Sequence, residues 1–113
     1  MSSIKLNNNK IKLLINDDEN KFIEFNPSDL QFALKVEQMY KSISEIKIEN
    51  NVECLVDVCE TIDEEIDNLF GEGKAKMIFD GQMDVYLYTQ FIEALIPYVK
   101  EASEKRVAKY LNK

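Results

Sequence analysis

The sequence predicts an α+β fold that is mostly helical, in which an N-terminal β-hairpin packs on three main α-helices and one short helix. Two short apolar and aromatic runs flank a polar turn, and three longer stretches carry an apolar residue at every third or fourth position. Gly, Pro or Asn residues separate these segments. The chain has 113 residues, the size of one domain. We expect a single domain over 1–113, with 1–10 flexible, 11–25 forming the hairpin and 28–112 helical.

The hairpin is predicted from the short runs 11–15 and 22–25, in which Ile, Leu and Phe predominate. The polar residues Asp17 to Asn20 between these runs indicate the turn. Because an isolated hairpin is marginally stable in water, we expect this one to pack on the helices.

The first main helix is predicted over 28–48. Asn26 or Ser28 suits its N-cap, and Asn50-Asn51 ends it. Its predicted core face consists of Phe32, Val36, Met39, Tyr40, Ile43 and Ile46.

The second main helix is predicted over 52–70, because apolar residues recur there at alternating steps of three and four. This stripe consists of Val52, Leu55, Cys59, Ile62, Ile66 and Leu69. It is too short for a long coiled coil, so we expect a helix packed in a bundle. The remaining surface of this helix is acidic, without Lys or Arg, and consists of Glu53, Asp57, Glu60, Asp63, Glu64, Glu65 and Asp67.

The short helix is predicted over 73–79. The last helix is predicted from Asp84, as N-cap, to about Leu111, and Pro97 should kink or split it. Its apolar stripe consists of Tyr88, Phe91, Ile92, Leu95, Val99 and Ala102.

Composition and charge narrow the range of functions. The net charge of −7 argues against nucleic-acid binding, which needs a basic surface to neutralise phosphates. The chain has no His, the commonest general base and metal ligand, so we expect no enzymatic activity and no cofactor. No apolar run is long enough to span a bilayer, and the polar start lacks a signal-peptide core. We therefore expect a cytoplasmic protein that binds no membrane.

Two loops invite ligand-binding interpretations that their spacing does not support. The segment Gly71-Glu72-Gly73-Lys74 lacks the spacing between glycines, and the Ser or Thr after the Lys, that a phosphate loop needs. We interpret Gly71 as a left-handed helix C-cap, after which the chain restarts a helix. The segment from Asp80 to Phe91 lacks the central Gly and final Glu of a calcium loop, so Asp80-Gly81 is interpreted as a turn.

The cysteines and the acidic residues have structural interpretations. Cys54 and Cys59 lie about 140° apart on a helix, which argues against a disulfide, and Cys59 is expected in the core. Acid–base catalysis needs a pocket that shifts pKa values, whereas the acidic face is expected to be solvated. It either confers solubility or pairs with the basic end of the last helix, within the chain or across a dimer.

The candidate protein-interaction residues are Met83, Tyr86, Lys105, Arg106 and Lys109. A flexible Met side chain suits either an irregular core or an adaptable contact with a helical partner, and both remain open for Met83. The three cations belong to a basic stretch over 100–113. This stretch could contact a membrane or nucleic acid, but a solvated helix face is the simpler interpretation.

The most distinctive segment is Leu69-Phe70-Gly71-Glu72-Gly73-Lys74-Ala75-Lys76-Met77-Ile78-Phe79, which precedes a helix carrying Phe91-Ile92-Glu93-Ala94-Leu95. With the hairpin and the acidic helix before it, this order resembles a family of short proteins encoded in tail-gene modules of bacteriophages and prophages of Gram-positive bacteria. In that family a helix ends in FGEGxAxxIF and is followed by an FxEAL-like helix. The resemblance covers residues 10–110.

The resemblance implies a tail assembly chaperone that binds the tape-measure protein in the host cytoplasm. Such a protein keeps the tape-measure protein soluble while the tail tube polymerises, and it is absent from the finished virion. No binding residues follow from the resemblance, because the shared element is structural. Two alternatives remain: a structural tail connector retained in the virion, and a small prophage regulator that binds a host protein. We also expect a homo-oligomer, since the helices offer more apolar surface than a small core uses.

Overall fold

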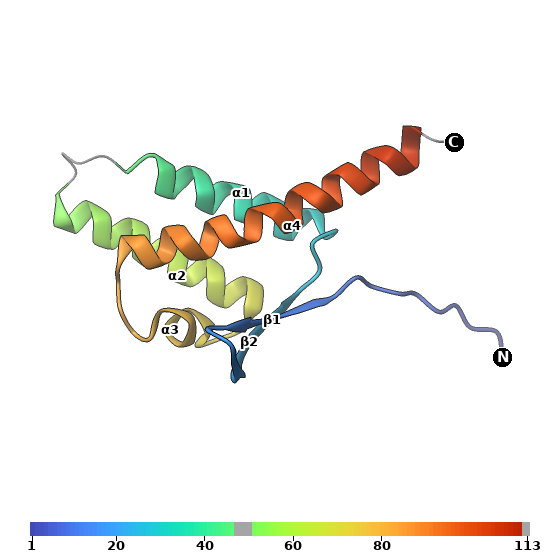
Figure 1. Ribbon diagram of the computed structural model, residues 1–113, viewed down its shortest axis with the longest axis horizontal. Helices are drawn as coiled ribbons and strands as arrows, with labels where there is room; N and C mark the ends of the chain where they lie inside the picture. Colours follow the sequence, from blue (N-terminus) through green and yellow to red (C-terminus); the bar gives the residue numbers. More distant parts are fainter. Residues whose placement is uncertain (47–50, 112–113) are drawn as a thin grey trace.

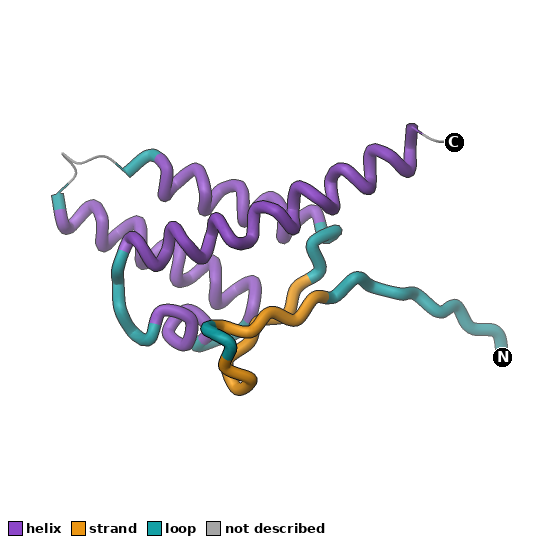
Figure 2. Tube along the Cα trace, viewed as in Figure 1, coloured by secondary structure: helices purple, strands orange, loops and turns teal. Residues whose placement is uncertain are grey.

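The chain begins with an antiparallel hairpin and continues through four helices in the computed structural model, which describes residues 1–46 and 51–111 (Figure 1, Figure 2). The strands are β1 (Ile11–Ile15) and β2 (Asp18–Phe25), and the helices are α1 (Leu30–Ser44), α2 (Val52–Phe70), α3 (Lys74–Phe79) and α4 (Val85–Leu111). The predicted fold class, α+β and mostly helical with an N-terminal hairpin, is therefore confirmed.

The hairpin turn is shorter than predicted. Asn16 and Asp17 have φ angles of 53° and 60°, in the left-handed region that Asn and Asp tolerate and that tight two-residue turns require. The residues from Asp18 onward therefore belong to β2, and assigning them to the turn was wrong. β2 has 8 residues against 5 in β1, and a register irregularity between Leu14 and Ile15 takes up the difference.

Helix α1 is shorter than the predicted helix. Its N-cap is Asp29, whose carboxylate accepts a backbone N–H of the first turn at 2.9 Å, and not Asn26 or Ser28. The Asn26 side chain instead accepts the N–H of Ser28 at 2.9 Å, which shapes the turn before the helix. α1 ends at Ser44, and the predicted continuation over 47–48 lies outside the described residues.

Helix α2 has the predicted bounds. Its N-cap is Asn51, whose side chain accepts the N–H of Cys54 at 2.8 Å, while Asn50 lies outside the described residues. Cys54 is exposed and Cys59 is buried, and neither forms a disulfide. The core position predicted for Cys59 is therefore confirmed.

The junction between α2 and α3 depends on two glycines. Gly71 has φ 125° and ψ 153°, an extended conformation that is nearly exclusive to glycine, and not the predicted left-handed helical one. Gly73 takes the left-handed conformation, with φ 83° and ψ −2°. The chain then restarts a helix at Lys74, as predicted, and Asp80-Gly81 forms a turn after it with two further positive φ angles.

Helix α4 is continuous through Pro97. Its first turn is capped by Asp84, as predicted, because the Asp84 carboxylate accepts the N–H of Tyr86 at 2.9 Å. The expectation that Pro97 could split the helix is wrong. Pro97 and Glu93 are both exposed, so the Glu93 carbonyl that loses its N–H donor can be hydrated.

All but two of the predicted core positions are buried or half-buried. Tyr40 and Val52 are 43% and 73% exposed. Tyr40 is rotated by 100° from the buried Met39, onto the flank of α1. Val52 begins α2 at the end of the helix that is remote from the hairpin (Figure 1). Both were wrongly assigned to the core.

The core is built around a continuous series of aromatic rings contributed by β2 and by every helix of the described structure. In contact order the rings are Tyr98, Phe25, Phe32, Phe70, Phe91, Phe79 and Tyr88. Phe25 stacks on Phe32 with centroids 4.9 Å apart, and Phe79 stacks on Tyr88 at 3.9 Å. These rings attach the hairpin to the helices, which a two-stranded sheet needs for stability.

Two extensions make the molecule elongated. Its radius of gyration is 16.4 Å, whereas a compact domain of this length has about 13 Å. The N-terminal segment and the C-terminal part of α4 both project from the body (Figure 1). Over the described ranges, no helix combines the length and the apolar character that a membrane span requires.

Candidate protein-interaction surfaces

The five candidate interaction residues fall into two separate groups. Met83 lies just before α4 and Tyr86 lies in its first turn, and they are 43% and 80% exposed. Lys105, Arg106 and Lys109 lie near its other end. At 1.5 Å per residue, Tyr86 and Lys105 are about 28 Å apart along the helix. The structure therefore does not bring the five residues together into one site.

The acidic face of α2 does not pair with the basic end of α4 within the described part of the chain. Glu65 instead pairs with Lys35 of α1, with Oε2 and Nζ 3.2 Å apart. Lys105 pairs with Glu101 of its own helix at 3.1 Å. The expectation of pairing within the chain is wrong for these residues, because α1 and not the end of α4 lies beside Glu65.

Two members of the acidic face have structural roles, so the expectation of a uniformly solvated face is also wrong. The Asp67 carboxylate accepts the backbone N–H of Ala75 at 2.9 Å, which joins the end of α2 to α3. The Asp63 carboxylate accepts the hydroxyl of the buried Tyr88 at 2.6 Å. This bond satisfies the one polar atom of a side chain that otherwise packs in the core.

Burial governs the ionisation of the Asp63 and Tyr88 pair. Partial removal from water raises the pKa of Asp63, the hydrogen bond from Tyr88 opposes this shift, and the charge of Asp67 adds to it. Burial, followed by the hydrogen bond to Asp63, raises the pKa of Tyr88. Burial also raises the pKa of the neighbouring Cys59 thiol, which favours its protonated and less reactive form.

Replacing Asp63 with Asn should change the pH dependence of stability. Because the pKa of Asp63 is raised in the folded state, this state holds the proton more tightly than the unfolded state does. The free energy of unfolding therefore falls as pH rises through the folded-state pKa of Asp63. The unfolding free energy of wild type, relative to Asp63→Asn, should therefore decrease between pH 3 and pH 7, by at most about 1.4 kcal/mol per pH unit. Urea titrations at several pH values measure this difference.

The matched control is Asp57→Asn, which makes the same change at an exposed carboxylate of the same helix. The role given to burial of Asp63 is contradicted if the unfolding free energy of wild type, relative to Asp63→Asn, rises with pH. It is also contradicted if this difference changes with pH no more than the difference between wild type and Asp57→Asn.

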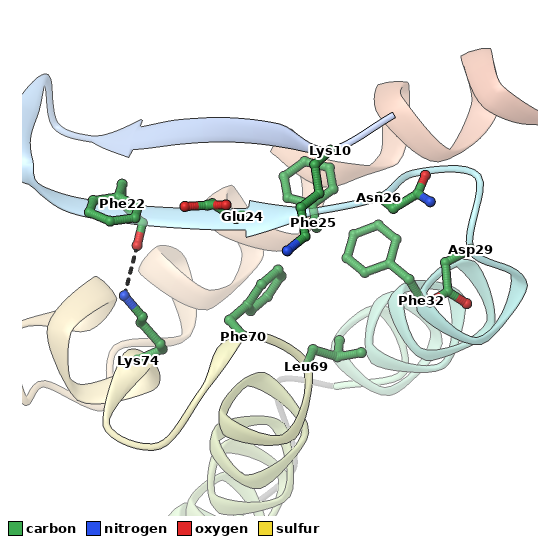
Figure 3. A pocket seen from close by; sticks show the side chains of 10 residues that line it. All are labelled: Lys10, Phe22, Glu24, Phe25, Asn26, Asp29, Phe32, Leu69, Phe70 and Lys74. Atoms are coloured by element: carbon green, nitrogen blue, oxygen red, sulfur yellow. Dashed lines mark hydrogen bonds between the residues drawn. The ribbon is translucent and has the colours of Figure 1, made fainter. Parts of the chain in front are cut away.

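A hollow between the hairpin and the helices, which we call the aromatic groove, has a volume of about 520 Å³ (Figure 3). Its lining comes from β2, α1, α2 and α3, from the residue before β1 and from the segment between β2 and α1: Lys10, Phe22, Glu24, Phe25, Asn26, Asp29, Phe32, Leu69, Phe70 and Lys74. None of the five candidate interaction residues lines it.

The apolar wall of the groove consists of rings held by the core. Phe70 lies edge-on to both Phe25 and Phe32, with centroids 6.1 Å and 6.0 Å away (Figure 3). Glu24 and Asp29 add carboxylates, and Lys10 and Lys74 add ammonium groups. Apolar rings with charges of both signs suit a peptide segment that carries apolar and charged side chains, and not a polyanion.

The Lys of the Gly71-Glu72-Gly73-Lys74 segment has a structural role in this groove. Lys74 Nζ donates to the backbone oxygen of Phe22 at 3.1 Å, and it lies 4.9 Å from the centroid of the Phe22 ring (Figure 3). The interpretation of this segment as a helix end and restart is confirmed by the geometry. Sequence reasoning missed the groove, because Lys74 and Phe22 are 52 positions apart.

No arrangement for metal binding is present in the described residues. Over 1–46 and 51–111, no group of three or more His, Cys, Asp or Glu side chains is placed to hold an ion. The carboxylates of Asp63, Glu65 and Asp67 are each bonded to other protein groups.

Comparison with other proteins identifies the family of the chain. Neither curated proteins nor solved structures give a match. One family model matches residues 18–113, which takes in all of β2 and every helix. The protein therefore belongs to DUF6673, a family of unknown function.

Proposed function

We propose that this protein is a non-enzymatic, tail assembly chaperone-like protein of a phage or prophage, which binds the tape-measure protein in the host cytoplasm. One observation carries the proposal. The segment Leu69 to Phe79, which resembles that of tail-module proteins, contributes Leu69, Phe70 and Lys74 to the aromatic groove. The element that identifies the resemblance therefore lies at a surface whose chemistry suits a peptide.

The groove has the chemistry that a transient peptide contact needs. Leu69 and Phe70 are half-buried and offer apolar surface to a Leu, Ile or Phe side chain of a helical client, with the buried rings of Phe25 and Phe32 behind them. Glu24 and Lys74 can pair with client charges and set its register. A hollow of about 520 Å³ accommodates only a few side chains, so binding is reversible and the client can be released as the tail tube forms.

The net charge of −7 supports the same function. A chaperone that presents apolar surface must itself stay dispersed, and charge repulsion between copies favours this. The polar composition around the groove keeps the apolar area small enough to avoid general aggregation.

Co-expression with the tape-measure protein encoded nearby tests the proposal. We expect more of that protein in the soluble fraction, and a complex that co-purifies with this chain. The matched control is an unrelated acidic helical protein of similar size at equal expression. No complex and no gain in solubility over the control would refute the proposal.

Mass spectrometry of purified particles separates this function from the alternative of a structural tail connector. The chaperone is expected to be absent from particles or present far below stoichiometric amounts. Stoichiometric retention identifies a connector instead. Capture of one host protein from lysate without phage, with no effect on the tape-measure protein, identifies a prophage regulator.

A further inference from the structure

The N-terminal arm, which we define as residues 1–9, is an extended segment with strand-like sequence. Ile4 and Leu6 are 85% and 88% exposed, and the arm runs away from the body (Figure 1). Ile4 and Leu6 alternate with Lys5 and Asn7, so an extended arm has one apolar and one polar side. Among residues 1–46 and 51–111, none covers its apolar side.

The arm repeats the sequence that opens β1. Ile4-Lys5-Leu6 has the same residues as Ile11-Lys12-Leu13. In β1 the Ile and Leu are half-buried, and the Lys between them is exposed. The same tripeptide in the arm is therefore suited to a strand that packs its Ile and Leu against this protein and leaves its Lys in water.

One edge of β1 is free to accept such a strand. The sheet of the described residues has two strands, so β1 pairs with β2 on one side only. The outer edge of β2 is already engaged, because Lys74 donates to the oxygen of Phe22 there. The unpaired N–H and C=O groups of an edge strand are a template for another strand.

Two hollows lie between β1 and α4 along this free edge. The first, of about 210 Å³, is lined mainly by apolar side chains, including Leu14, Ile78, Leu87 and Phe91. The second, of about 500 Å³, lies at the start of β1, has a mostly polar lining and includes Asn8 and Asn9 of the arm itself. No residue of β2 lines either hollow. The first hollow offers an apolar place beside β1 for side chains that point to one side of an added strand.

We propose that the N-terminal arm of one molecule adds as a third strand to the free edge of β1 in a second copy, with Ile4 and Leu6 seated between β1 and α4. Reciprocal exchange of arms closes a two-fold dimer. Lys12 Nζ lies 4.1 Å from the centroid of the Phe22 ring, so the ammonium group is directed towards β2. This orientation keeps it away from the Lys5 of an incoming arm. This contact gives the expected homo-oligomer a defined interface, and it does not depend on the tape-measure protein.

Light scattering of the full-length protein after size-exclusion chromatography tests the proposal without any tape-measure protein present. Wild type should have twice the mass of the 13.2 kDa chain at micromolar concentration. The double variant Ile4→Asp/Leu6→Asp should raise the dissociation constant of the dimer about tenfold or more, because it puts two charges into apolar contacts. The control Ser3→Asp/Asn7→Asp adds the same charge at alternate positions and should remain dimeric.

A second variant tests the accepting edge. Leu14→Asp changes an exposed residue of β1 that lines the first hollow, and it should weaken the dimer while circular dichroism stays that of wild type. A monomeric wild type, as expected if the arm folds back on its own β1, overturns the proposal. The proposal is also overturned if the two aspartate double variants raise the dissociation constant of the dimer equally. It is likewise overturned if Leu14→Asp leaves this constant unchanged.

Discussion

Replacing Phe79 with Ala is expected to lower the free energy of unfolding by about 3–5 kcal/mol, the usual cost of removing a buried Phe. Phe79 is 2% exposed, stacks on Tyr88 at 3.9 Å and lies edge-on to Phe91 at 5.8 Å. Phe79 is the only ring that α3 contributes to the aromatic series, so its replacement by Ala leaves a cavity where α3 meets α4. For a domain stabilised by about 5–15 kcal/mol, this is a large fraction of the total.

Denaturant unfolding followed by circular dichroism measures this loss, and Phe22→Ala is the matched control. Phe22 is half-buried in the hairpin, and its ring is approached by the ammonium groups of Lys12 and Lys74 at 4.1 Å and 4.9 Å. Losing these contacts should cost about 1–2 kcal/mol. Equal losses for the two variants would contradict the central place of Phe79 in the core.

Replacing Leu69 with Asp is expected to weaken binding of the tape-measure protein by at least about tenfold, and to remove it from the co-purified complex. Leu69 is half-buried at the end of α2 and lines the aromatic groove. A carboxylate at this position puts a charge beside the rings of Phe25, Phe32 and Phe70, where an apolar client side chain is expected. The measurement is the yield of complex after co-expression, followed by titration with the purified components.

The matched control is Leu34→Asp, which makes the same change on the outer face of α1. Leu34 is 53% exposed and does not line the groove. Thermal unfolding of both variants separates loss of binding from loss of folding. If Leu34→Asp reduces binding as much as Leu69→Asp while both remain folded, the aromatic groove is not the binding surface.

The helices could be located from the sequence because their signals are local. The spacing of Cys59, Ile62 and Ile66 follows the 3.6-residue period, and all three residues are buried on one face of α2. Caps also act over two or three residues, so Asp84 was correctly predicted to begin the last helix. Asn51 was predicted only to end the first helix, and it also begins α2 as its N-cap. Where local signals competed, as with Asn26, Ser28 and Asp29, the choice of cap depended on the exact path of the chain.

Burial of polar residues could not be predicted in this way. Asp63 looks like its acidic neighbours on a helical wheel, yet it meets Tyr88, which lies 25 positions later in the chain. At the hairpin, Asp18 belongs to a strand because it pairs with Ile15 of β1, and the polar residues 19–21 after it fall in the register irregularity before the pair of Leu14 and Phe22.

The sequence by itself determined the order and type of the elements, the acidic charge and the lack of His, because these follow from composition and from contacts between near neighbours. Only the tertiary structure decided which aromatic rings meet, that Lys74 bonds to Phe22, and that the candidate residues at the two ends of α4 stay apart. The physical reason is the range of the interactions. Helix periods and caps act over a few residues, whereas the aromatic groove needs the hairpin, α1 and the α2–α3 junction to pack together first.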